Sequence, residues 1–126
     1  MFWKHPGIQY DPDEPTYVTE GIIDALSLIE MGFQAIAVLT SGQDPAKINL
    51  GELSGNLVIA FDSDSAGAGG LKKWNAAFPE SDAITPLIGD WNDILALWYF
   101  ALKANLRQSI GCDVLACYYW QIIAAN

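Results

Sequence analysis

Acidic side chains stand in this sequence at positions where metal-dependent chemistry on phosphate groups would need them. Asp62 and Asp64 follow the apolar run 57–61, and Glu20 follows the β-prone run 17–19. In an extended turn, residues i and i+2 point to the same side, so Asp62 and Asp64 can meet one cation or two neighbouring cations. Carboxylate oxygens select hard ions, Mg²⁺ above all and Mn²⁺ as its substitute, and Mg²⁺ leaves coordination positions for phosphate oxygens. The pattern therefore predicts a Mg²⁺ site for phosphoryl transfer.

Two further acidic residues, Asp90 and Asp93, follow the apolar run 82–87 in the same way. Carboxylates gathered without a cation repel one another, and some of their pKa values rise, so such a cluster is costly unless an ion binds. A simpler interpretation stays open, in which Asp62 and Asp64 only shape a turn and cap a helix. Asp24 has a similar alternative as a solvated helix residue.

The elements that would position these residues alternate between strand and helix. Apolar or β-prone runs predict strands at 17–19, 35–39, 57–61 and 82–87, while helical periodicity and capping residues predict helices at 22–31, 45–53, 66–78 and 94–107. Asp44 with Pro45 is a helix-start signal, Asp93 is a candidate cap for the helix at 94–107, and Gly32 is a helix stop. We expect an α/β fold with a mainly parallel sheet of about four strands flanked by helices, whose ligands bind outside the carboxyl ends of the strands.

The two ends of the chain differ from this alternating region. Residues 1–16 hold Pro6, Pro12 and Pro15, which predicts an extended arm or linker. Residues 109–126 are apolar and predict a C-terminal helical extension that packs on the domain or on a missing neighbour. The domain itself is expected at residues 17–108.

Composition limits the partners. The chain has 126 residues, which fits one domain, and its formal net charge of −9 lacks the basic stripe of a surface that binds nucleic acid by itself. Contact with nucleic acid would need bridging metal or a basic groove on another domain. Cys112 and Cys117 have neither disulfide-framework nor zinc spacing, and neither a signal peptide nor a membrane span is indicated. We expect a soluble cytoplasmic protein without membrane contact.

Two motifs together carry a family resemblance. Glu20-Gly21 directly follows a strand, and an apolar strand leads into the DxDxAG pattern at 62–67, which a helix follows. Over residues 15–95 this arrangement resembles the Toprim domain of DnaG-type primases, type IA and type II topoisomerases and OLD-family nucleases. The resemblance implies a Rossmann-like Toprim fold.

Finer features are most similar to plasmid and phage primases and primase–helicases. They are the EGxxD element at 20–24 and the acidic loop Asp90-Trp91-Asn92-Asp93. By this resemblance Glu20, Asp62 and Asp64 would be catalytic, with Asp62 and Asp64 as metal ligands and Glu20 as a ligand or an aid to proton transfer. The resemblance also implies secondary acidic metal contacts from Asp24, Asp90 and Asp93. Lys72 and Lys73, just after the aspartates, are weak candidates for phosphate contact, and the alternative is that they form a solvated face.

The implied function is nucleotidyl transfer in RNA primer synthesis for DNA replication, with Mg²⁺ or Mn²⁺ as cofactor. The single-stranded DNA template and the nucleotides would be bound through other domains, either a zinc-binding or basic primase domain or a helicase domain. No P-loop is present, so the helicase half is absent from this sequence, and we expect no activity without partner domains. Two alternatives remain: a Toprim nuclease of the OLD or small ribonuclease type, in which Glu20 is the general base, and a non-catalytic interaction module.

Overall fold

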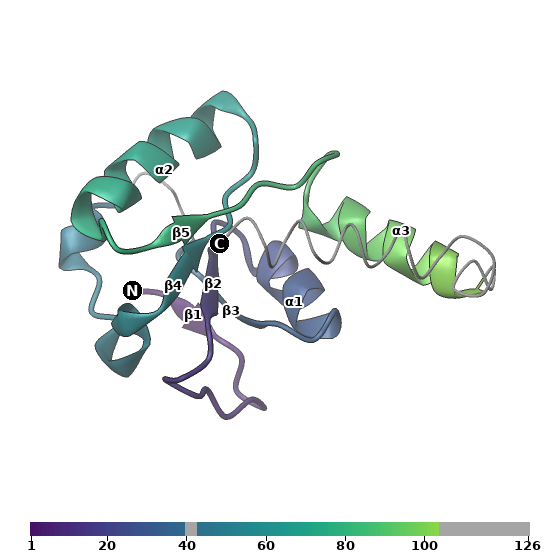
Figure 1. The fold of residues 1–126 in the computed structure, drawn as a ribbon, viewed down its shortest axis with the longest axis horizontal. Coiled ribbons are helices and arrows are strands. Elements are labelled where there is room, and N and C mark those ends of the chain that lie inside the picture. Colours follow the sequence, from purple (N-terminus) through teal and green to yellow (C-terminus); the bar gives the residue numbers. More distant parts are fainter. Residues whose placement is uncertain (40–42, 104–126) are drawn as a thin grey trace.

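One mixed sheet organises the part of the chain that the computed structural model describes, residues 1–39 and 43–103 (Figure 1). Its five strands lie in the order β1-β3-β2-β4-β5. All neighbouring pairs are parallel except β1 with β3, which is antiparallel. The strands are β1 (Trp3–Lys4), β2 (Thr16–Thr19), β3 (Gln34–Ala37), β4 (Leu57–Ile59) and β5 (Asp82–Ala83). The α/β fold with a mostly parallel sheet is therefore confirmed, with one strand more than expected.

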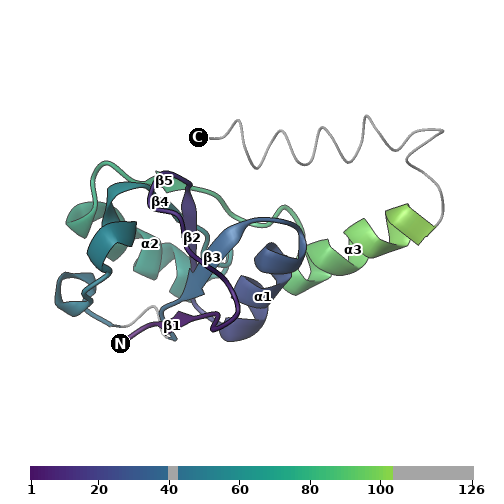
Figure 2. The ribbon, with the colours of Figure 1, turned by 90° about the horizontal axis from the view of Figure 1, so that it is seen from below.

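Helices cover both faces of the sheet. On one side lie α1 (Ile22–Glu30) and α3 (Trp91–Lys103), and on the other lies α2 (Ser65–Ala77), as Figure 1 shows; Figure 2 gives the same arrangement from below. Two short 3₁₀ helices, η1 (Pro45–Lys47) and η2 (Gly51–Gly55), connect β3 to β4. The hydrophobic core therefore has two halves, one on each face of the sheet, where the helices pack against the central strands.

The central strands are buried on both faces, as the unbroken apolar runs predict. Along β2, Tyr17 packs with the core beneath α1 and α3, whereas its neighbour Val18 packs with the core beneath α2. Val18 pairs with Ile36 of β3 and with Ile59 of β4, so three apolar residues stand in one row across the sheet. This alternation follows from the two-residue period of a strand and fixes the register of the sheet.

Several predicted element limits differ from the observed ones. The predicted strand at 82–87 is only two residues long, because Pro86 has no N–H to donate and only one further backbone bond, from Ile84 N to the Ile59 carbonyl at 2.9 Å, extends the pairing. The predicted helix at 45–53 is two 3₁₀ segments, although Asp44 does cap the first, with Pro45 at its first position. Gly32 ends α1 in a left-handed conformation with φ of 99°, as expected.

The N-terminal arm is joined to the sheet. Trp3 and Lys4 form the edge strand beside β3, and the Tyr10 hydroxyl donates to the Ala35 carbonyl. No helix among the described residues is long and apolar enough to cross a membrane. The predicted C-terminal extension at 109–126 lies outside the described residues, and the domain limits at 17 and 108 remain predictions.

Candidate metal centre

Glu20 and Asp62 are brought to one edge of the sheet by strand register. β2 and β4 are parallel neighbours, and the Ala60 N–H donates to the Val18 carbonyl at 2.8 Å. Glu20 and Asp62 each lie two residues beyond this bonded pair, at the carboxyl ends of their strands. The buried Thr19 side chain steadies the turn, since its hydroxyl lies 2.9 Å from the Gly21 carbonyl. The predicted convergence of these two carboxylates is therefore present in the fold.

One oxygen on each of these two carboxylates is buried without a hydrogen-bond partner. The atoms are Oε1 of Glu20 and Oδ1 of Asp62. An ionised carboxylate only accepts hydrogen bonds, and a buried acceptor left unsatisfied costs about 1–3 kcal/mol, more when it is charged. Carboxylate oxygens of this kind are the ligands that hard cations prefer. The donor set at this edge thus fits Mg²⁺ or Mn²⁺.

Asp24 reaches the same edge from the first turn of α1. Its carboxylate lies close to Gly21, the N-cap residue that precedes the helix, since a Cβ at Gly21 would stand 3.5 Å from Asp24 Oδ2. Burial raises the pKa of Asp24 to about 6, and the charges of Asp62, Asp90 and Glu20 add to the rise. The backbone N–H of Trp91 opposes it by donating to the carboxylate. Asp24 is therefore a close member of the acidic group.

The charge on Asp62 is opposed by the same surroundings. Burial is the largest cause that raises its pKa, followed by the charges of Glu20, Asp90 and Asp64. These mutual effects indicate that carboxylates from three stretches of the chain, 20–24, 62–64 and 90, share one electrostatic environment. We use the term acidic edge for this group, which consists of Glu20, Asp24, Asp62, Asp64 and Asp90.

Asp93 takes a different position at the start of α3. Its Oδ2 accepts from the Asp90 N–H at 3.1 Å, and its own N–H donates to Asp90 Oδ1 at 2.9 Å. This is a reciprocal capping box, in which Asp90 precedes the helix and Asp93 is its third residue. The prediction that Asp93 itself caps a helix beginning at residue 94 is wrong, because α3 begins at Trp91. The charge of Asp93 is not among the causes that shift Asp24 or Asp62.

Trp91 holds this capping turn against the sheet. Its side chain is fully buried, and its indole Nε1 donates to the Ala60 carbonyl at 2.9 Å, just before Asp62. Sequence reasoning treated Trp91 only as part of an acidic loop and missed this role. The signal in the sequence was a tryptophan between two acidic residues. A tryptophan that becomes buried needs an acceptor for its indole N–H, so it can anchor such a turn.

The acidic edge is not a closed metal cage. Within residues 1–39 and 43–103, no three or more His, Cys, Asp or Glu side chains are grouped closely enough to hold an ion by themselves. Mg²⁺ commonly takes only one or two carboxylates and keeps several water molecules or phosphate oxygens as its other ligands. The open arrangement is therefore compatible with an ion that substrate phosphates help to hold.

A family comparison agrees with this architecture. A family model described as Toprim-like matches residues 17–95, from the second residue of β2 to the first turns of α3. The chain belongs to the Toprim-like family. Searches of the curated proteins and of the solved structures gave no match.

Toprim domains bind divalent metal ions, which agrees with the carboxylate-rich chemistry of the acidic edge. The family match does not assign ligands to individual residues. Lys72 and Lys73, predicted as weak phosphate contacts, are exposed on α2. They lie seven and eight residues beyond its start, which is roughly 10–12 Å along the helix axis. Their role stays a prediction.

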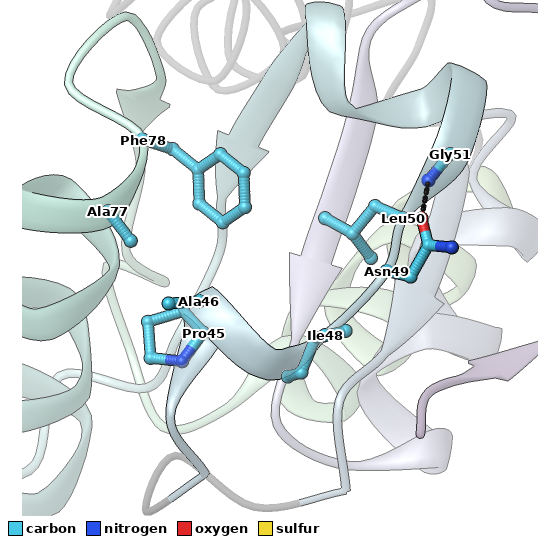
Figure 3. A pocket seen from close by; sticks show the side chains of 8 residues that line it. All are labelled: Pro45, Ala46, Ile48, Asn49, Leu50, Gly51, Ala77 and Phe78. Carbon is cyan, nitrogen blue, oxygen red and sulfur yellow. Dashed lines mark hydrogen bonds between the residues drawn. The ribbon is translucent and has the colours of Figure 1, made fainter.

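A pocket lies at the opposite end of α2 from the acidic edge. Its volume is about 330 Å³, and it opens between the two 3₁₀ helices and the last turn of α2 (Figure 3). Phe78 projects over it from the end of α2, and Asn49 Oδ1 accepts from the Gly51 N–H at 3.0 Å on its far side. No charged residue lines this pocket. It therefore offers no carboxylate for a metal ion and is separate from the acidic edge.

Proposed function

We propose that this Toprim-like chain is the metal-binding catalytic domain of a DNA primase or primase–helicase. It would assist nucleotidyl transfer in the synthesis of RNA primers for DNA replication. The observation that carries the proposal is the pair of unpartnered buried oxygens on Glu20 and Asp62, with Asp24 beside them. The EGxxD spacing that places Asp24 at this edge favours the primase type within the family.

Each residue has a distinct part in this proposal. Asp62 and Glu20 would hold the ion through their buried oxygens, and Asp64 would add a contact from the start of α2. Asp24 and Asp90 keep the edge negative, while Asp24 also fixes the first turn of α3 by accepting from the Trp91 N–H. A bound divalent ion supplies acidification of a coordinated hydroxyl or water and neutralisation of phosphate charge.

The template would have to be held elsewhere. With a formal net charge of −9, the chain repels a nucleic-acid backbone unless cations or a basic partner intervene. We therefore propose that a zinc-binding or basic primase domain, or a helicase domain, presents single-stranded DNA and nucleotides to the acidic edge. A cytoplasmic location and a plasmid or phage origin belong to the same proposal.

A Toprim nuclease is the second candidate, and one observation favours it. The free Oε1 of Glu20 could accept a proton from an attacking water, the role of a general base in phosphodiester cleavage. The product separates the two functions. Extension of a primer indicates the primase, whereas shortened nucleic acid without nucleotide incorporation indicates the nuclease.

The first test is calorimetric titration of the complete chain with Mn²⁺ and with Mg²⁺. We expect the parent to bind Mn²⁺ and the Asp62→Asn variant to lose at least about tenfold in affinity, because a charged ligand is replaced by a neutral one. Asp93→Asn is the matched control, since it makes the same chemical change within the capping box. Equal affinity in all three proteins would overturn the metal site. No binding by the parent would favour a non-catalytic interaction module.

A further inference from the structure

A small pocket adjoins the acidic edge on the side of the sheet that α2 covers. Its volume is about 150 Å³. Three segments line it: the loop after β4, the first half of α2 and the residues that follow β5. The lining residues are Phe61, Asp62, Ser63, Ala68, Leu71, Ile84 and Thr85.

The size and walls of this pocket suit one six-membered ring. An apolar protein cavity of about 150 Å³ accommodates a benzene molecule, whereas a fused double ring needs more room. Phe61 and Ile84 are buried and Leu71 is partly buried, so much of the wall is apolar. Ser63 and Thr85 are exposed and supply hydroxyl groups at the rim. An apolar pocket with a few polar groups is the usual form of a small-ligand site.

The pocket and the acidic edge share Asp62. Asp62 is one of the residues that line the pocket, and its carboxylate has an unpartnered buried oxygen. A molecule with a planar ring at one end and a phosphate at the other would therefore reach both places. We propose that this pocket receives the base of a single-ring (pyrimidine) nucleotide whose phosphate lies at the acidic edge. The inference rests on the proposed function, because phosphate would approach these carboxylates only with a bridging cation.

The pocket at the other end of α2 does not offer this combination. Although it is larger, none of its lining residues is charged, and it is lined by Ala77 and Phe78 at the end of α2 rather than by Asp62. A nucleotide there would have no contact with the acidic edge. Only the small pocket would let one nucleotide place its base in a pocket and its phosphate at the acidic edge.

The test compares four probes on the complete chain in the presence of Mn²⁺: cytidine 5′-monophosphate, uridine 5′-monophosphate, adenosine 5′-monophosphate and ribose 5-phosphate. We expect the two pyrimidine nucleotides to bind about tenfold or more tightly than ribose 5-phosphate, because only they bury a ring that fits. Adenosine 5′-monophosphate is expected to bind like ribose 5-phosphate. Equal affinity for all four probes would overturn the inference.

An alanine on α2 provides a variant with a matched control. Ala68→Leu adds bulk to the pocket, and Ala76→Leu makes the same change at an exposed position on the same helix, outside the lining of both pockets. Ala68→Leu should abolish the preference for pyrimidines without changing the affinity for Mn²⁺, and Ala76→Leu should leave both unchanged. If the two variants retain the same preference, the pocket does not receive the base.

A second measurement separates this inference from the proposed function. Cytidine, which has no phosphate, is added in excess to the chain without metal while the methyl signals of Leu71 and Ile84 are followed by nuclear magnetic resonance. Shifts in the parent that disappear in Ala68→Leu would support the pocket even if Mn²⁺ did not bind. Absence of shifts alongside normal Mn²⁺ binding would reject the pocket and leave the metal site intact.

Discussion

Asp24 stands where its surroundings oppose its negative charge. Burial and the charges of Asp62, Asp90 and Glu20 raise its pKa to about 6 from an ordinary value near 3.8. The sequence pattern EGxxD indicated that Asp24 would lie near Glu20, but it could not indicate the extent of burial. Burial depends on segments distant in the sequence, and one of them, the start of α3, contacts Asp24 through the Trp91 backbone N–H. A cluster of this kind stores repulsion that a bound cation would relieve.

This repulsion predicts an unusual dependence of stability on pH in the absence of metal. Because the folded state binds the Asp24 proton more tightly than the unfolded state, the destabilising effect is absent below about pH 4 and complete above about pH 6. The free energy of unfolding should therefore fall as pH rises through this window. Asp24→Asn should be more stable than the parent at pH 7 and gain less at pH 4, since asparagine carries no charge and its side-chain oxygen can still accept from the Trp91 N–H.

Urea denaturation in the presence of a chelator, at pH 4 and at pH 7, measures this difference. Asp11→Asn is a suitable control, because Asp11 is exposed and outside the acidic edge. A parent and an Asp24→Asn variant that lose stability in parallel between the two pH values would contradict the assignment of the repulsion to Asp24.

At the scale of elements, the central strands could be predicted more closely than the segments at the margin. β2, β3 and β4 are continuous apolar or β-prone runs, and their observed limits differ by a few residues from the predicted ones. The start of α3 was misplaced because Asp90 and Asp93 are both good capping residues and sequence alone does not choose between them. The structure chooses Asp90, since Trp91 can then enter the core and bond to the Ala60 carbonyl. Tertiary packing decided between two local signals of similar strength.

The capping box predicts that Asp93 supports the fold more than it supports metal binding. Asp93→Ala removes the acceptor of the Asp90 N–H and should lower the free energy of unfolding by about 1 kcal/mol. Asn92→Ala, at the adjacent exposed position, is the control. Thermal or urea unfolding measures the loss, and Mn²⁺ titration should give similar affinities for both variants. A large fall in Mn²⁺ affinity for Asp93→Ala alone would instead make Asp93 a metal contact.

At the scale of the whole molecule, the N-terminal arm completes the edge of the sheet. The proline content of residues 1–16 indicated an extended segment, and Trp3–Lys4 does extend along β3. What the sequence could not indicate is the network that holds it. The Tyr10 hydroxyl accepts from the His5 N–H at 3.1 Å and donates to the Ala35 carbonyl, while Gln34 Oε1 accepts from the Asp11 N–H at 2.7 Å. The bonds to Ala35 and to Gln34 join residues 25 and 23 positions apart, beyond the reach of local patterns.

The arm therefore predicts a stability effect far from the acidic edge. Tyr10→Phe keeps the ring but leaves the His5 N–H and the Ala35 carbonyl without their partner, which should lower the free energy of unfolding by about 1–2 kcal/mol. Tyr99→Phe is the matched control, because its hydroxyl bonds to exposed Glu30 and water can replace that bond. If the arm were a loose linker, the two variants would unfold at the same urea concentration. A lower midpoint for Tyr10→Phe alone, with Mn²⁺ affinity unchanged, would show that the first ten residues belong to the folded domain, because an edge strand that merely rested on β3 would not transmit the loss of one hydroxyl to global unfolding.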